Sequence, residues 1–122
     1  MGYRIDFDVR EGALYAVVRG KSSSAHAAWI GQDIAEQARR HATRRLLIDL
    51  RGLAGRVGNL ATLLSAPRGA RALANCKVAV LDIEDNDPYY VFAEMNSRGV
   101  GDGLRYFAQP SAALSWLSGS YL

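Results

Sequence analysis

The residues with the clearest chemical potential lie at a junction between a buried strand and the helix after it, from Asp49 to Leu60. Glycines recur at every third position of this junction, at Gly52, Gly55 and Gly58. Glycine lets backbone N–H groups approach a ligand closely, and the free N–H groups at the start of a helix attract anions. The pattern therefore predicts a site for an anion or a phosphate headgroup beside Leu60, beyond the carboxyl end of the strand.

Arginines flank the same junction and supply positive charge. Arg51 and Arg56 can make charge-assisted hydrogen bonds to an anion, and Gly58 and Asn59 stand at the predicted helix start. The spacing is not Gly-x-Gly-x-x-Gly, and no Lys followed by Ser or Thr appears, so a nucleotide-binding loop is not indicated. The alternative interpretation, that the glycines only shape a surface loop, stays open.

The helix predicted after the junction supplies a second candidate site. Its apolar stripe is followed by two arginines without a neighbouring acid; these residues are Leu60, Leu63, Leu64, Arg68 and Arg71. Such a segment suits a membrane interface or the cover of a hydrophobic pocket. Packing of the leucines against a sheet explains them equally well.

Three further side chains bear on this second candidate. Phe92 and Met95 share one face of the helix predicted over 87–99, as core residues or as the wall of a hydrophobic pocket. Trp29 lies nearly opposite the apolar stripe of the helix predicted over 22–41, at ~100° per residue. A tryptophan on a polar face is a candidate anchor for a partner, a second subunit or a membrane interface. A loop that folds over it is the alternative.

No residue pattern indicates catalysis, a cofactor or a metal. The acidic loop 82–87 lacks the spacing and the glycine of an EF-hand loop. His26 and His41 lie on a helix with no Ser or Cys beside them to form a triad. Cys76 precedes an apolar strand and is interpreted as a small buried hydrophobe rather than a reactive thiol. We therefore expect a non-enzymatic protein.

Length and charge set the broad class of the protein. The 122 residues are expected to form a single domain over 1–122, and the lack of a long apolar run predicts a cytoplasmic location. The net charge of +3 is unevenly spread, because 37–81 is strongly basic with Asp49 as its only acid, whereas 82–102 is acidic. Such a surface suits an acidic partner, a phosphate group or anionic lipid; arginines solvated on separate faces are the alternative.

Apolar periodicity predicts strands that alternate with helices after an opening hairpin. The expected strands are 3–9, 13–20, 45–50, 77–81 and 104–107, and the expected helices are 22–41, 60–73, 87–99 and 110–117. This order predicts an α/β layered fold with a mixed, mostly parallel sheet of about five strands and about four helices. The nearly continuous apolar strand at 45–50 is expected at the centre of the sheet.

The carboxyl-terminal part of the chain carries the most specific pattern. The aromatic strand Leu-Arg-Tyr-Phe at 104–107 leads to Ala-Ala-Leu-Ser-Trp-Leu at 112–117. Together with Leu-Leu-Ile-Asp-Leu at 46–50 and Ala-Val-Leu at 79–81, it resembles the SpoIIAA-like family of bacterial proteins. That family is related in fold to STAS domains, typified by anti-sigma-factor antagonists, and is similar in structure to CRAL-TRIO lipid carriers. The resemblance covers nearly the whole chain.

The resemblance also implies where a regulatory switch would sit. In STAS antagonists a strand ending in Asp-Leu precedes a helix whose first turn holds a serine, and its phosphorylation breaks the partner complex by charge repulsion. Here Asp49 and Leu50 match the strand end, but the helix start at 57–60 reads Val-Gly-Asn-Leu and has no hydroxyl. Thr62 and Ser65 lie further along and would have to substitute. The usual phosphoserine switch is therefore not expected.

Two functions stay open. The first is a regulatory module that binds a protein partner through 51–64. The second is a carrier or sensor of a hydrophobic, lipid-like ligand at a membrane surface, with a pocket lined by the leucines at 60–64, Phe92 and Met95 and with arginines at the headgroup. Nucleic acid is not an expected partner, because the basic segment has no interleaved aromatics. A homodimer is compatible with either function.

Overall fold

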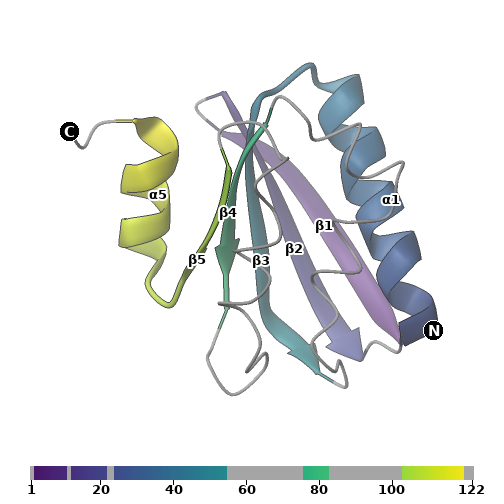
Figure 1. Ribbon diagram of the computed structural model, residues 1–122. Coiled ribbons are helices and arrows are strands. Elements are labelled where there is room, and N and C mark those ends of the chain that lie inside the picture. Colours follow the sequence, from purple (N-terminus) through teal and green to yellow (C-terminus); the bar gives the residue numbers. More distant parts are fainter. Residues whose placement is uncertain (1, 11, 22–23, 55–75, 83–102, 120–122) are drawn as a thin grey trace.

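The protein forms a sheet between two helices in the part that the computed structural model describes, residues 2–10, 12–21, 24–54, 76–82 and 103–119. The strands are β1 (Tyr3–Arg10), β2 (Ala13–Lys21), β3 (Arg45–Ala54), β4 (Lys77–Leu81) and β5 (Gly103–Phe107), and the helices are α1 (Ser24–Arg40) and α5 (Pro110–Ser118). Figure 1 shows α1 on one face of the sheet and α5 on the other. Neither described helix has the length and apolar character needed to span a membrane.

The five strands lie side by side in chain order, β1-β2-β3-β4-β5. β1 pairs antiparallel with β2, whereas the β2–β3, β3–β4 and β4–β5 pairs are parallel. The predicted hairpin, the mostly parallel sheet and the central position of the third strand are thereby confirmed. The helices predicted over 60–73 and 87–99 lie outside the described residues.

The face of the sheet under α1 is filled mainly by aliphatic side chains of β2, β3 and β4, most of them at every second position, with Cys76 just before β4. This cluster comprises Leu14, Ala16, Val18, Leu46, Ile48, Leu50, Leu53, Cys76, Val78 and Val80. Ile30, Ile34 and Ala38 of α1 pack onto it and are at most 3% exposed. The predicted apolar stripe of the first helix is therefore confirmed for these residues.

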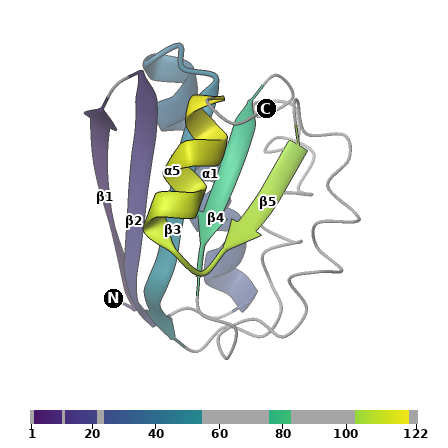
Figure 2. The same ribbon diagram turned by 90° about the vertical axis from the view of Figure 1, so that its left-hand side faces the viewer.

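The opposite face of the sheet is covered only in part. Ala113, Trp116 and Leu117 of α5 pack onto Leu47 of β3 and Ala79 of β4. The contacts of α5 are with β3, β4 and β5, and Figure 2 shows β1 and β2 beside this helix rather than beneath it. Among the described elements, none covers β1 and β2 on this face.

One predicted boundary is wrong, because β3 does not end at Leu50 but continues to Ala54. Its last residues pair with the end of β2, with Gly52 opposite Arg19 and Leu53 opposite Gly20. Leu53 is 1% exposed, and its burial together with the continued ladder outweighs the turn signal of the glycines. Gly52 is thus a strand residue rather than part of the loop, and a side chain there would press on the stem of Arg19.

Candidate functional site

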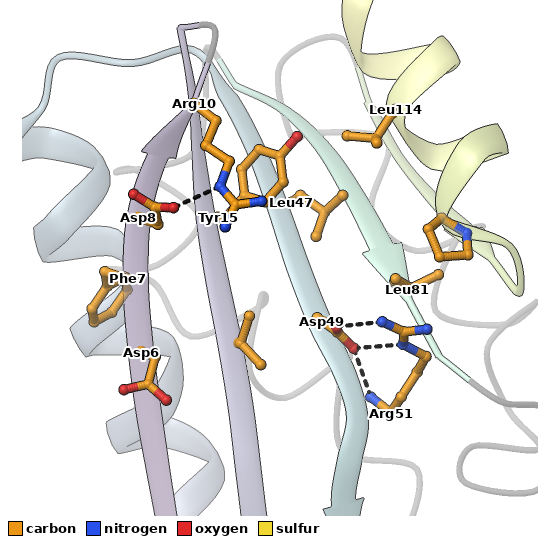
Figure 3. Close-up of a pocket in the computed structure, with 12 residues that line it drawn as sticks. Asp6, Phe7, Asp8, Arg10, Tyr15, Leu47, Asp49, Arg51, Leu81 and Leu114 are labelled. Carbon is orange, nitrogen blue, oxygen red and sulfur yellow. Dashed lines mark hydrogen bonds and ion pairs between the residues drawn. The ribbon is translucent and has the colours of Figure 1, made fainter.

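A groove of about 370 Å³ lies on the sheet face that α5 covers only in part. Its floor is apolar and comes from Tyr15 and Val17 of β2 and Leu47 of β3. Pro110 and Leu114 of α5 form one wall. Figure 3 shows Leu114 and Leu47 facing the same hollow as Tyr15. The groove exists because a helix of nine residues cannot cover a five-stranded sheet.

An ion pair closes the β3 side of the groove. Arg51 donates from Nε to Oδ1 of Asp49 (3.1 Å), from Nη2 to Oδ2 (2.9 Å) and from its backbone N–H to Oδ1 (3.1 Å). The Asp49 side chain is 13% exposed and the Arg51 side chain 44% exposed. Two parallel bonds between guanidinium and carboxylate fix the direction of both groups. Figure 3 shows the pair near Leu81, on the β3 side of the groove.

The charge state of Asp49 follows from this pairing. Partial burial by itself would raise the pKa of Asp49, but hydrogen bonds from Arg51, with the positive charges of Arg51 and Arg19, hold that pKa below its ordinary value. The side-chain hydrogen bond that Arg51 donates to Asp49 in turn raises the pKa of Arg51. Both groups are therefore charged near neutral pH, and the groove ends in a fixed ion pair.

A second row of charges borders the groove along β1. Arg10 Nε lies 2.6 Å from Asp8 Oδ2, and the Arg10 guanidinium carbon lies 5.3 Å from the centre of the Tyr15 ring, within the range of a cation–π contact. Asp6 is paired with Arg4, with 3.0 Å between Nη2 and Oδ1. The groove is thus apolar in the middle and bounded by ion pairs on both sides.

Trp116 and its neighbours hold the α5 wall in position. The Trp116 ring lies 5.7 Å from the ring of Phe107. Lys77 places its Nζ 4.6 Å from the centre of the Trp116 ring and donates a hydrogen bond to the Trp116 carbonyl oxygen. Trp116 is 6% exposed, which confirms that it is a packing residue. Leu114, in contrast, is 40% exposed, because it faces the groove rather than the core.

Two of the predicted site residues fall within the described structure. Arg51 lines the groove, and its guanidinium is held by Asp49; its contact with an anion stays a prediction. Trp29 is 58% exposed, which confirms its place opposite the buried stripe of α1, while its role as an anchor also stays a prediction. The remaining predicted site residues lie outside the described residues: Arg56, Gly58, Asn59, Leu60, Leu63, Leu64, Arg68, Arg71, Phe92 and Met95.

Other predictions about single residues can be compared with the structure. Cys76 is 4% exposed, its thiol lies 3.8 Å from the Thr43 carbonyl oxygen, and burial raises its pKa. Its interpretation as a buried small residue is confirmed. Asp82 is 5% exposed and directly follows Leu81, the β4 residue that pairs with Asp49. Within the described ranges, no group of three or more His, Cys, Asp and Glu side chains could hold a metal ion.

Sequence reasoning missed most of the groove. The sequence predicts a half-buried strand at 3–9 and its partner at 13–20, but it does not indicate that Asp6, Asp8, Arg10 and Tyr15 line a groove. The groove could have been predicted from the short length of the carboxyl-terminal helix compared with the width of a five-stranded sheet, because such a helix leaves part of one face uncovered. Alternating charges on β1 mark that uncovered part.

No protein-family model matches the chain, and no curated protein sequence matches it. Among solved structures, an anti-sigma factor antagonist from Mycobacterium paratuberculosis matches with a TM-score of 0.67 and 15% identity, over 95% of this chain and 94% of the other. The anti-sigma factor antagonist SpoIIAA in its unphosphorylated form matches with a TM-score of 0.61 and 16% identity, over 96% of each chain.

A third structure is similar over the same length. It is an uncharacterized protein with a SpoIIAA-like fold from Shewanella loihica, with a TM-score of 0.59 and 16% identity, over 95% of this chain and 94% of the other. The chain has the SpoIIAA-like fold. In this chain the Asp49–Arg51 pair of β3 lies at the border of the groove beside α5.

Proposed function

We propose that this SpoIIAA-like protein is a non-enzymatic regulatory module that acts by protein–protein contact through 51–64, without the usual phosphoserine. The observation that carries the proposal is the Asp49–Arg51 pair in the second half of the central strand. A guanidinium that is already fixed loses less conformational freedom when a partner binds. Arg51 is the first residue of the proposed contact segment, and β3 continues through it to Ala54.

The class of partner is proposed from the structural neighbours and from charge. Two of those neighbours are anti-sigma factor antagonists, so a cytoplasmic anti-sigma factor is the partner that we propose. The segment 37–81 is strongly basic, which favours an acidic surface on that partner. Residues 57–60, which the sequence predicts as a helix start, have no hydroxyl, so the contact would be regulated by something other than a phosphate at that position.

The experiment is affinity capture from a lysate of the organism that encodes the chain, followed by mass spectrometry. Wild-type protein is compared with Arg51→Ala and with Arg39→Ala as a matched control. Arg39, like Arg51, is an exposed arginine paired with a carboxylate of its own element, Glu36, at 2.5 Å. We expect an anti-sigma factor to be retained by the wild type and by Arg39→Ala, and to be reduced at least about tenfold by Arg51→Ala.

Two outcomes would contradict the proposal. One is the absence of any such partner from the wild-type capture. The other is a partner that stays bound permanently when Thr62→Ala and Ser65→Ala are combined. That result would mean that phosphorylation of one of these hydroxyls normally releases the partner.

A second candidate function has one observation in its favour, the apolar floor of the groove at Tyr15, Val17 and Leu47. Such a surface suits the hydrocarbon part of a lipid-like ligand, and a carrier of such a ligand could associate peripherally with a membrane. Native mass spectrometry of freshly purified protein tests this function, because a bound ligand adds to the measured mass of the protein. Binding to anionic liposomes would support this function if the double variant Arg68→Glu with Arg71→Glu reduced it. Protein that carries no ligand and does not bind liposomes would exclude it.

A further inference from the structure

The outer edge of the sheet at β1 is a second surface, independent of the proposed function. In the sheet formed by the described strands, β1 has a neighbour on one side only. A sheet edge presents backbone N–H and C=O groups that another strand can pair with. Its side chains decide whether such pairing is favoured or opposed.

The side chains of β1 divide cleanly between the two faces of the sheet. Arg4, Asp6, Asp8 and Arg10 alternate with Tyr3, Ile5, Phe7 and Val9. The first set lies on the groove face, where three of its members line the groove. Tyr3, Ile5 and Phe7 of the second set pack against the core under α1. Any strand added to β1 would therefore meet a charged row on one face and an apolar row on the other.

The charged row is accessible and has a symmetric order of signs. Arg4 and Asp6 have side chains that are 76% and 43% exposed, and Arg10 and Asp8 have side chains that are 65% and 56% exposed. Read along the strand, the signs run plus, minus, minus, plus. Charges on an edge strand usually oppose pairing, but a sequence of signs can also select one register and exclude the others.

We propose that a second copy of this chain pairs antiparallel with β1, with Asp6 opposite Asp6 of the second copy. In this register Arg4 lies opposite Asp8 of the second copy, and the symmetry of the pair gives that contact twice. On the apolar face Ile5 lies opposite Phe7 of the second copy, and Tyr3 lies opposite Val9. Seven residues of each strand, Tyr3 to Val9, take part, and every apolar side chain meets an apolar one.

The other registers that keep the two apolar rows together are shorter or bring like charges together. A register centred on Ile5 would place Arg4 opposite Asp6 twice, but it would engage only residues 3–7 of β1 and leave Asp8 and Val9 outside the ladder. A register centred on Phe7 would place Arg4 opposite Arg10 and Asp6 opposite Asp8, so that all four facing pairs carry like charges. A register centred on Asp8 would engage only residues 6–10 of β1 and leave Arg4 outside the ladder. In the proposed register the one like-charge contact is Asp6 with Asp6, and each of these carboxylates is already paired with Arg4 of its own chain at 3.0 Å.

The consequence is a continuous sheet across both copies, with the two grooves on the same face. Backbone hydrogen bonds would supply affinity, and the side-chain rows would supply register. A seven-residue ladder is a small interface, so we expect a dimer that forms at high protein concentration and weakens as salt screens its ion pairs.

The test uses two charge reversals on the full chain, Arg4→Asp and Asp8→Arg. Alone, Arg4→Asp would place Asp opposite Asp8, and Asp8→Arg would place Arg opposite Arg4, twice in each dimer. In an equimolar mixture each contact joins opposite charges again. We expect sedimentation velocity from about 1 µM to about 1 mM to show a wild-type dimer, at least about tenfold weaker association of each variant alone, and recovery in the mixture.

A further variant tests the centre of the register. Asp6→Asn removes the only like-charge contact and should tighten the dimer. Circular dichroism of every variant establishes that the monomer is folded. A wild-type monomer at all concentrations overturns the proposal, as does a dimer that neither charge reversal weakens. Two weakened variants that do not recover on mixing would overturn the register. None of these outcomes depends on the anti-sigma factor.

Discussion

The two faces of the sheet use the same strands in different ways. Beneath α1, the side chains of Leu14, Ile48 and Val80 are at most 1% exposed, and aliphatic side chains of the helix pack onto them. Beneath α5, the buried cluster around Trp116 reaches β3 and only Tyr15 of β2 packs against its edge, so Tyr15 and Val17 are only half-buried. One face is therefore specified by close packing, and the other combines a packed half with an open groove bounded by ion pairs. This difference separates the part that holds the fold from the part available for binding.

The largest expected effect contrasts one side chain from each face. Ile48→Ala removes a fully buried side chain from the central strand and should lower the free energy of unfolding by about 2–5 kcal/mol. Leu114→Ala, on the groove wall, should cost about 1 kcal/mol or less because Leu114 is 40% exposed. Urea unfolding followed by tryptophan fluorescence measures both. Equal losses for the two variants would mean that the groove face is packed as tightly as the core.

Thiol labelling offers a second contrast with a different readout. Cys76 lies under α1 and its pKa is raised by burial, so its reaction with a thiol reagent requires the fold to open. A Leu114→Cys variant made in a Cys76→Ala background places a thiol in the groove. We expect the groove thiol to react at least about a hundredfold faster than Cys76. Similar rates would show that the α1 face opens as readily as the groove.

A smaller effect concerns the packed half of the α5 face. Lys77→Met keeps the aliphatic stem but removes both the charge above the Trp116 ring and the hydrogen bond to the Trp116 carbonyl oxygen. The free energy of unfolding should fall by about 1 kcal/mol. Lys21→Met, at the end of β2, is a control in which an exposed lysine is lost. If Lys77→Met and Lys21→Met had the same free energy of unfolding, apolar packing alone would hold α5 on the sheet.

The smallest effect concerns the ion pair on the β3 side of the groove. The pKa of Asp49 is lowered in the folded state, so its contribution to stability is present above the unfolded pKa of about 3.9 and is lost as pH falls through the folded pKa. Arg51→Ala should cost less than about 1 kcal/mol near neutral pH and should flatten the loss of stability in acid. Unfolding midpoints between about pH 7 and about pH 2.5 measure this.

A matched variant assigns that pH dependence to one group. Asp49→Asn removes the titration and should give the same flattened profile as Arg51→Ala. A wild-type profile that neither substitution alters would mean that other carboxylates dominate the acid sensitivity.

The fold was predictable to the extent that each strand carried its own signal. Alternation at 3–9 and the apolar run at 46–50 identified β1 and β3, and the 3.6-residue stripe through Ile30 and Ile34 identified α1. The end of β3 was not predictable, because Gly52 signals a turn locally while its strand conformation depends on pairing with Arg19. That pairing is a tertiary contact, which local propensity does not contain.

The same distinction between local signals and tertiary contacts applies to the candidate site. Arg51 was identified because its position after a buried strand is informative in the sequence, but its capture by Asp49 depends on strand geometry. The groove depends on how far α5 reaches across the sheet, and no single residue encodes that distance. Charges on β1 were visible as an alternating row, and only the strand order placed them at an edge.

That strand order has a consequence for synthesis of the chain. Since the strands are arranged in the order in which they leave the ribosome, the sheet can grow in one direction, each strand adding to the edge left by the last. Until residue 81 has emerged, the apolar strand β3 is itself an open edge, without its neighbour β4. Nascent chains paused in this interval would expose a long aliphatic edge, so translation speed over the segment between β3 and β4 should govern how much of the protein aggregates.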